Sequence, residues 1–306
     1  IEDLRILLQS FIYPAGVMIA SNRLQERNRA LMAELNRHNS TLDDENTRLR
    51  QEQVIMASHA CGIIANSQNM RQVLDLTLRV SRSSLPVLVL GETGVGKDMI
   101  VRLLHSLSER RAKPLIAQNC AALPESAIES EMFGYTHEAS SGRVEGRQGV
   151  FESANKSTLF LDKISDLSIP LQGKLLRALE DGEIRPSGSE NPVRCDVRLV
   201  AASHIDLATC VSEGRFREDL FYRIAGFPIR VPPLRERDDI ELLAEHFLVC
   251  FSHDHGRSGL SFDPDVRIFF HEYRFPGNVR ELRNMIERAV LLADNNSKIN
   301  AADLRN

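Results

Sequence analysis

The stretch VLVLGETGVGKD, residues 87–98, constrains the fold of this chain more than any other feature. Four apolar residues lead into a glycine-rich turn, and a helical pattern follows Lys97. The spacing from Gly91 to Gly96 and Lys97 is that of a P-loop, whose backbone N–H groups converge on phosphate oxygens. The N-terminus of the next helix adds its positive dipole end. We therefore predict a phosphate site at the end of a buried strand, the alternative being a purely structural turn.

Short apolar segments alternate with amphipathic ones through the middle of the chain. Apolar segments predict strands at residues 87–90, 115–119, 158–162, 198–203 and 227–231, and helical spacing predicts helices at 98–110, 122–133, 168–181 and 211–224. This alternation is typical of an α/β fold, a parallel sheet with helices on both faces. After about residue 235 we expect no further strands, only helices at 241–255, 263–273 and 278–293. We predict an α/β region at 57–234 and a small helical region at 235–306.

The first 56 residues have the pattern of a long helix. Apolar side chains recur at seven-residue intervals, and the stripe shifts by four residues midway: Val17, Leu24, Leu31, Leu35, Leu42 and Leu49. A seven-residue apolar repeat on a polar helix predicts a coiled coil. The other half of the seam holds Asn28, His38 and Glu45, so we expect a weak, switchable dimer linker. The alternative is a long helix packed on its own globular domain.

Composition excludes several classes of function. The 306 residues have a net charge of −4, so the whole chain is not an electrostatic nucleic-acid binder. No apolar run reaches the roughly 18 residues of a membrane span, and we expect no membrane partner. The five cysteines have no metal-ligand spacing, which predicts reduced thiols in a cytoplasmic protein. The chain begins without Met in a helical pattern, which indicates a piece of a longer protein.

A set of motifs from about residue 62 to 306 carries a family resemblance. In order they are GETGVGKD, NCAALPESAIESEMFG, TLFLDKI, LQGKLLRALEDGEIRPSG, VRLVAAS, GRFREDLFYRI, FPIRVPPLRERDDI and FPGNVRELRNMIERAV. This set closely resembles the AAA+ P-loop core of bacterial enhancer-binding proteins, the ATPase activators of sigma-54 RNA polymerase. It covers about four-fifths of the chain. Residues 1–20 are more weakly similar to the last helix of a GAF sensor domain, which implies a signal-responsive regulator.

The resemblance implies roles for individual residues. It assigns nucleotide binding to the P-loop and to the sensor II residue: Gly91, Glu92, Thr93, Gly94, Val95, Gly96, Lys97, Asp98 and Arg280. Asp162 would hold Mg²⁺ through water, and Asn119 would sense the γ-phosphate. Arg217 and Arg223 match arginine fingers that reach a neighbouring subunit's nucleotide; such a finger can supply roughly 10³–10⁵ in rate. The implied cofactors are ATP or ADP and Mg²⁺.

The residue after Asp162 departs from the family pattern. Family members have Glu there and this chain has Lys163. A carboxylate accepts a hydrogen bond from an attacking water, whereas an ammonium cannot. We therefore expect weak or absent hydrolysis, with the ammonium pairing with the γ-phosphate. The alternative is that Lys163 turns outward and another carboxylate, Asp166 being nearest in sequence, serves as the base.

A second departure lies in the loop that engages sigma-54 in the family, where members carry GAFTGA. The same positions hold Glu138, Ala139, Ser140, Ser141, Gly142 and Arg143. Serine cannot press an aromatic ring against a partner, so this loop predicts loss of sigma-54 coupling, unless the family tolerates variation there. Two milder departures are His204, in the sensor I segment, and Asp98, in place of the usual Glu.

The function expected is an ATP-gated oligomeric switch in a bacterial transcriptional regulator, not coupled to sigma-54. One alternative is an active ATPase that remodels the sigma-54 holoenzyme. The other is a dimerisation module with a vestigial nucleotide site. The expected partners are further copies of the chain, as a coil dimer or a hexameric or heptameric ring, and RNA polymerase holoenzyme. Promoter DNA would be bound by a helix-turn-helix domain that does not occur before Asn306.

Overall fold

The structure is a computed structural model that describes residues 27, 29, 31–42, 45, 52, 56–58, 61–135, 146–189 and 191–305. It divides into two compact units, Ile1–Gln53 and Val54–Asn306, and each is described by itself. In the first unit, residues 31–42 form a helix on which the Leu31, Leu35 and Leu42 side chains are exposed. Val17, Leu24 and Leu49 lie outside the described residues, so the coiled coil stays a prediction.

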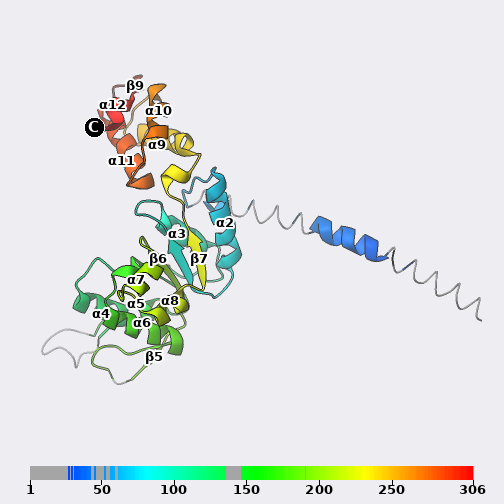
Figure 1. Ribbon diagram of the computed structural model, residues 1–306, viewed down its shortest axis with the longest axis vertical. Coiled ribbons are helices and arrows are strands. Elements are labelled where there is room, and N and C mark those ends of the chain that lie inside the picture. Colours follow the sequence, from blue (N-terminus) through cyan, green and yellow to red (C-terminus); the bar gives the residue numbers. More distant parts are fainter. Residues whose placement is uncertain are drawn as a thin grey trace, which may run out of the picture. The chain divides into compact units, whose positions relative to one another are not determined.

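A five-stranded parallel sheet forms the centre of the second unit (Figure 1). The strand order is β2-β3-β6-β1-β7. Their bounds are β1 Val87–Leu90, β2 Ile116–Asn119, β3 Thr158–Asp162, β6 Arg198–Ser203 and β7 Phe227–Arg230. The P-loop strand β1 lies inside the sheet, where Val87 pairs with Val200 on one side and Phe227 on the other. The five predicted strands are confirmed to within a residue at their ends.

Helices cover both faces of this sheet, because alternate strand residues point to opposite sides. Leu88, Leu159 and Ala201 enter one hydrophobic core, whereas Val89 and Phe160 enter the other. The helices are α2 Gln68–Ser81, α3 Lys97–Ser106, α4 Glu125–Phe133, α5 Val150–Ser153, α6 Ile169–Asp181, α7 Leu207–Ser212 and α8 Glu218–Ile224. A short antiparallel pair joins β4 Glu183–Ile184 to β5 Val193–Arg194. The predicted α/β fold class is confirmed.

The single helix predicted at 211–224 is wrong. The chain forms α7 and α8 instead, separated by a turn in which Gly214 has a φ of 70°. A left-handed glycine ends a helix at little steric cost, and this one re-aims the chain before Arg217. Arg217 therefore stands at the N-cap of α8 rather than inside a helix.

The C-terminal helices form a separate hydrophobic core and gather as one cluster in Figure 1. We call residues 235–306 the lid; its helices are α9 Ile240–Asp254, α10 Asp265–Glu272, α11 Asn278–Leu292 and α12 Ala301–Arg305. The expectation that strands stop near 235 is wrong. A two-residue parallel pair, β8 Ser261–Phe262 with β9 Lys298–Ile299, joins the segment between α9 and α10 to the segment between α11 and α12. Among the described residues, no helix is long and apolar enough to cross a membrane.

Candidate functional site

The P-loop connects the end of β1 to the start of α3. Gly94 and Gly96 have φ values of 83° and 96°, a region that side chains rarely adopt. A Cβ on Gly94 would collide with the carbonyl oxygen of Gly277 in the lid. The Lys97 ammonium curls back over the loop and donates to the carbonyl oxygens of Gly91 at 2.8 Å and Glu92 at 3.0 Å. The loop thus has the glycines, the ammonium and the helix N-terminus that suit a bound phosphate.

The ends of β2 and β3 place two polar residues side by side. Asn119 pairs in register with Asp162, and the Cys120 N–H donates to the Asp162 carbonyl oxygen at 2.9 Å. The Asn119 side chain accepts from the Ala121 N–H at 2.9 Å. Burial, together with the charges of Asp162 and Asp166, raises the pKa of the Cys120 thiol to about 12. This thiol stays protonated, so it takes no part in acid–base chemistry at the site.

Lys163 follows Asp162 in a left-handed backbone conformation with a φ of 53°. Its N–H donates to the Asp162 carboxylate at 3.0 Å. The residue is half-buried, and within the described part of the chain its ammonium has no hydrogen bond or ion pair. Asp166, the alternative base, lies three residues on in the short 3₁₀ helix Ile164–Asp166, where it accepts from Ser165 Oγ at 2.9 Å.

Lys97 is the centre of a group of charges drawn from several elements. Burial lowers the pKa of its ammonium; Asp162 and Asp98 oppose this, whereas Arg280 and Lys163 add to it. The P-loop residues and Asp162, Lys163 and Arg280 thus lie within one electrostatic neighbourhood. Among the described residues, no three His, Cys, Asp or Glu side chains gather as a metal site. A magnesium ion near Asp162 would therefore take its ligands from phosphate oxygens and water.

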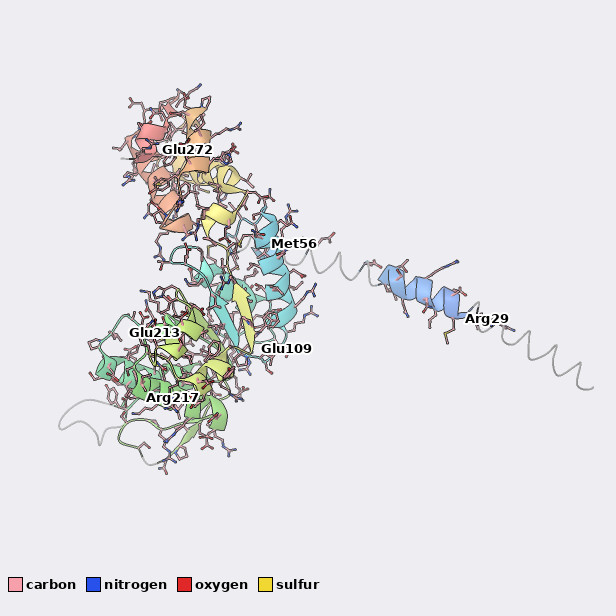
Figure 2. All side chains as sticks on the ribbon, viewed as in Figure 1. Arg29, Met56, Glu109, Glu213, Arg217 and Glu272 are labelled. Atoms are coloured by element: carbon pink, nitrogen blue, oxygen red, sulfur yellow. The ribbon has the colours of Figure 1, made fainter. Side chains whose placement is uncertain are left out.

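The two arginines matched to fingers lie elsewhere, near α8. Arg217, labelled in Figure 2, donates two guanidinium hydrogen bonds to the Asp219 carboxylate, at 3.0 and 2.7 Å. The backbone N–H of Arg217 donates to Gln172 Oε1 at 2.8 Å. Arg223 donates to the Leu179 carbonyl oxygen at 2.7 Å. Neither guanidinium contacts this chain's P-loop among the described contacts. Both are exposed, the placement that a contact with another subunit requires.

The sequence singles out Glu92 and His204, but it does not predict how either side chain is placed. Glu92 is held by the lid residues Arg235 and Asn278. This network joins residues that are far apart in sequence, so no local sequence pattern predicts it. His204, at the end of β6, has a buried Nδ1 with no partner in the described structure. The loop at 138–143 lies outside the described residues, so its loss of sigma-54 contact stays a prediction.

Two family models match this chain. A model described as "Sigma-54 interaction domain" matches residues 63–230, and one described as "AAA+ ATPase lid domain" matches residues 235–306. The first covers more than half of the chain.

Curated relatives and solved structures agree. The chain is 45% identical over 234 residues to a putative uric acid sigma-54-dependent transcriptional regulator, UacR, of Escherichia coli, covering 76% of this chain and 40% of that protein. It is 41% identical over 259 residues to the response regulator protein PilR of Pseudomonas aeruginosa, covering 84% and 58%. A crystal structure of NtrX from Brucella abortus in complex with ATP aligns with a TM-score of 0.73 at 30% identity, covering 79% and 53%. The chain thus spans about half the length of such relatives.

Proposed function

Because the chain belongs to the bacterial enhancer-binding proteins, a family of AAA+ regulators, we propose that it is a nucleotide-gated switch that binds ATP and hydrolyses it weakly or not at all. The observation that carries this proposal is that half-buried Lys163 directly follows Asp162, and that its ammonium makes no hydrogen bond or ion pair with a described residue. NtrX, whose crystal structure is similar to this chain, was crystallised with ATP and with ADP. Nucleotide binding by this chain itself is part of the proposal.

The P-loop residues Gly91 to Asp98 hold the phosphates in this scheme, and Lys97 leaves its two loop carbonyls to pair with them. Asp162 would hold Mg²⁺ through water, and the ion would supply charge neutralisation at the phosphates. Lys163 presents an ammonium where activation of water needs a proton acceptor. Its positive charge stabilises bound phosphate and leaves the attacking water without a base.

Assembly completes the switch. Arg217 and Arg223 are exposed and touch none of their own P-loop, so we assign them to the nucleotide of a neighbouring copy. ATP then stabilises contacts between subunits rather than driving a motor. RNA polymerase holoenzyme is the proposed downstream partner, and the serines at 140 and 141 favour action without sigma-54. The N-terminal unit would carry a signal to this assembly.

The test is ATP retention and phosphate release by the natural chain and by Lys163→Glu. The matched control is Lys156→Glu, because Lys156 shares the left-handed backbone, with a φ of 60°, but is exposed before the start of β3. We expect the natural chain to retain ATP and Lys163→Glu to raise phosphate release about 10²–10⁴-fold. The control should leave release unchanged. Ordinary turnover by the natural chain would contradict the proposal.

A second candidate is an active ATPase that remodels the sigma-54 holoenzyme. It is favoured by exposed Asp166, a carboxylate close to the end of β3. Turnover by the natural chain that disappears in Asp166→Asn and in Arg217→Ala would establish it. If no nucleotide raised the melting temperature, both candidates would give way to a dimerisation module, because a ligand specific for the folded state must stabilise it.

A further inference from the structure

Three successive P-loop residues are gripped by the lid. The Glu92 carboxylate accepts from Arg235 at 2.8 and 2.6 Å and from Asn278 Nδ2 at 3.1 Å. The same Nδ2 donates to the Thr93 carbonyl oxygen at 3.0 Å. The Gly94 carbonyl oxygen accepts the Arg280 N–H at 3.2 Å. The first turn of α11 thereby satisfies one of its unpaired N–H groups with the P-loop itself.

Asn278 is the centre of this grip. Its side chain is fully buried, and its backbone is left-handed with a φ of 54°. Asparagine tolerates this conformation better than other non-glycine residues, and hydrogen bonds from both ends of the side-chain amide hold it in place here. Asn278 Oδ1 accepts the Leu234 N–H at 2.8 Å, so one amide joins the residue just before the lid, the start of α11 and the P-loop.

Glu92 is also tied to the phosphate side of the loop. Its carbonyl oxygen accepts the Lys97 ammonium, while its carboxylate is bound to the lid. Glu92 therefore loses one of its hydrogen bonds when Lys97 moves to pair with a phosphate, and Glu92 is also the residue that the lid holds. Arg235 and Glu92 are about 40% exposed, and ion pairs of this exposure break at little cost.

We propose that Glu92, Arg235 and Asn278 form a latch through which the lid follows the state of the P-loop. Glu92 is then a positioning residue: its backbone belongs to the loop that holds the phosphates, but its carboxylate acts on the bound nucleotide by fixing the lid and not by touching phosphate. The latch rests on the nucleotide binding proposed above. It also needs no titration to work, since hydrogen bonds from Arg235 and Asn278 hold the pKa of Glu92 at about 2.

The test is hydrogen exchange with and without Mg-ATP on the whole chain, followed in peptides that contain the Arg280 and Leu234 amides. Both amides bridge the latch, one to Gly94 and the other to Asn278. In the natural chain we expect ATP to slow their exchange. Glu92→Gln should still bind ATP, about fivefold more weakly, and lose the slowing. Arg235→Gln should have the same effect from the lid side, and the double variant should be no worse than either single one.

The matched control is Glu236→Gln, which removes a neighbouring exposed charge that acts on Arg235 through space but makes no hydrogen bond or ion pair with a latch side chain among the described contacts. It should behave as the natural chain does, and melting temperatures should show that each variant folds. If Glu92→Gln binds ATP and its lid amides slow to the natural extent, the latch is wrong and the nucleotide site stands. If the natural chain binds no ATP, the latch and the proposed function both fall.

Discussion

Two arginines at the start of the lid, Arg235 and Arg237, make ion pairs of opposite character. The Arg237–Asp239 pair is buried, with 4% of each side chain exposed. The Arg235–Glu92 pair has 41% and 42% of its side chains exposed. A buried pair is costly to break because either partner alone is a charge without solvent, whereas an exposed pair exchanges readily with water.

The buried pair also organises the chain around it. Asp239 accepts the N–H groups of Asn66 and Ser67, both at 2.9 Å, and Arg237 donates to the Ile64 carbonyl oxygen at 2.9 Å. The lid is thus attached to residues 64–67 by a permanent junction and to the P-loop by a reversible one. The lid can therefore rotate about the permanent junction, which stays intact, while the reversible junction at the P-loop opens and closes.

The largest effect is expected at the permanent junction. Asp239→Asn leaves Arg237 buried without a counter-charge, which should lower the free energy of unfolding by about 3–5 kcal/mol. Guanidinium unfolding measures the loss, and Asp238→Asn is the control because Asp238 is the exposed neighbour. A loss for Asp239→Asn as small as that of the control would erase the contrast between the junctions.

A smaller effect is expected where the lid touches the P-loop backbone. Gly94→Ala combines a left-handed φ of 83° with a collision at the Gly277 carbonyl, and should cost about 2–3 kcal/mol. Gly96→Ala is the control, because its φ is 96° but a Cβ there meets nothing within 4 Å. It should cost only the backbone strain, about 1–2 kcal/mol. Equal losses without nucleotide would mean that the lid does not press on Gly94.

The smallest effect is expected for the reversible junction. Glu92→Gln should change the free energy of unfolding by no more than about 1 kcal/mol, since the pair is exposed. A loss near that of Asp239→Asn, measured by the same unfolding curves, would make the latch a structural element instead of a switch.

The pH dependence of stability tests the carboxylates of both junctions, Asp239 and Glu92. Burial would raise the pKa of Asp239, but the hydrogen bonds from Arg237 and from the Ser67 and Asn66 N–H groups outweigh it and lower the pKa. The pKa of Glu92 is lowered to about 2. A carboxyl group whose pKa is lowered in the folded protein stabilises the fold at pH values above its ordinary pKa of about 4. This stabilisation is lost as the pH falls towards the pKa of the folded state. From about pH 5.5 to 8 we expect neither junction to titrate, and unfolding curves across that range test it.

The sequence predicted the part of the site that is local in the chain. Strand–loop–helix spacing located Gly91 to Lys97, and an apolar run ending in Asp162 located the end of β3, which β6 separates from β1 in the sheet. The latch was not predictable, because Glu92 is 143 residues from Arg235 and 186 from Asn278. The break before Arg217 was missed because one left-handed glycine outweighs the helical pattern around it.

The roles of individual site residues and the bounds of the three regions stay predictions. The structure places Arg280 by its backbone contact to Gly94, but no contact tests its sensor role. The expected helix at 98–110 ends at Ser106, and the one at 122–133 begins only at Glu125, after Pro124. Such ends depend on caps and neighbours that periodicity does not encode.

The interior position of β1 has a consequence for synthesis. Val87 cannot find either of its sheet partners until the ribosome has made Val200 and then Phe227. At roughly 5–20 residues per second, the P-loop strand waits on the order of ten seconds as an apolar segment with two unpaired edges. During that interval its best protection is a chaperone or the nascent helices α2 and α3, whose residues share its core. Slow translation between residues 90 and 200 should therefore favour aggregation of the nascent chain more than slow translation after residue 235.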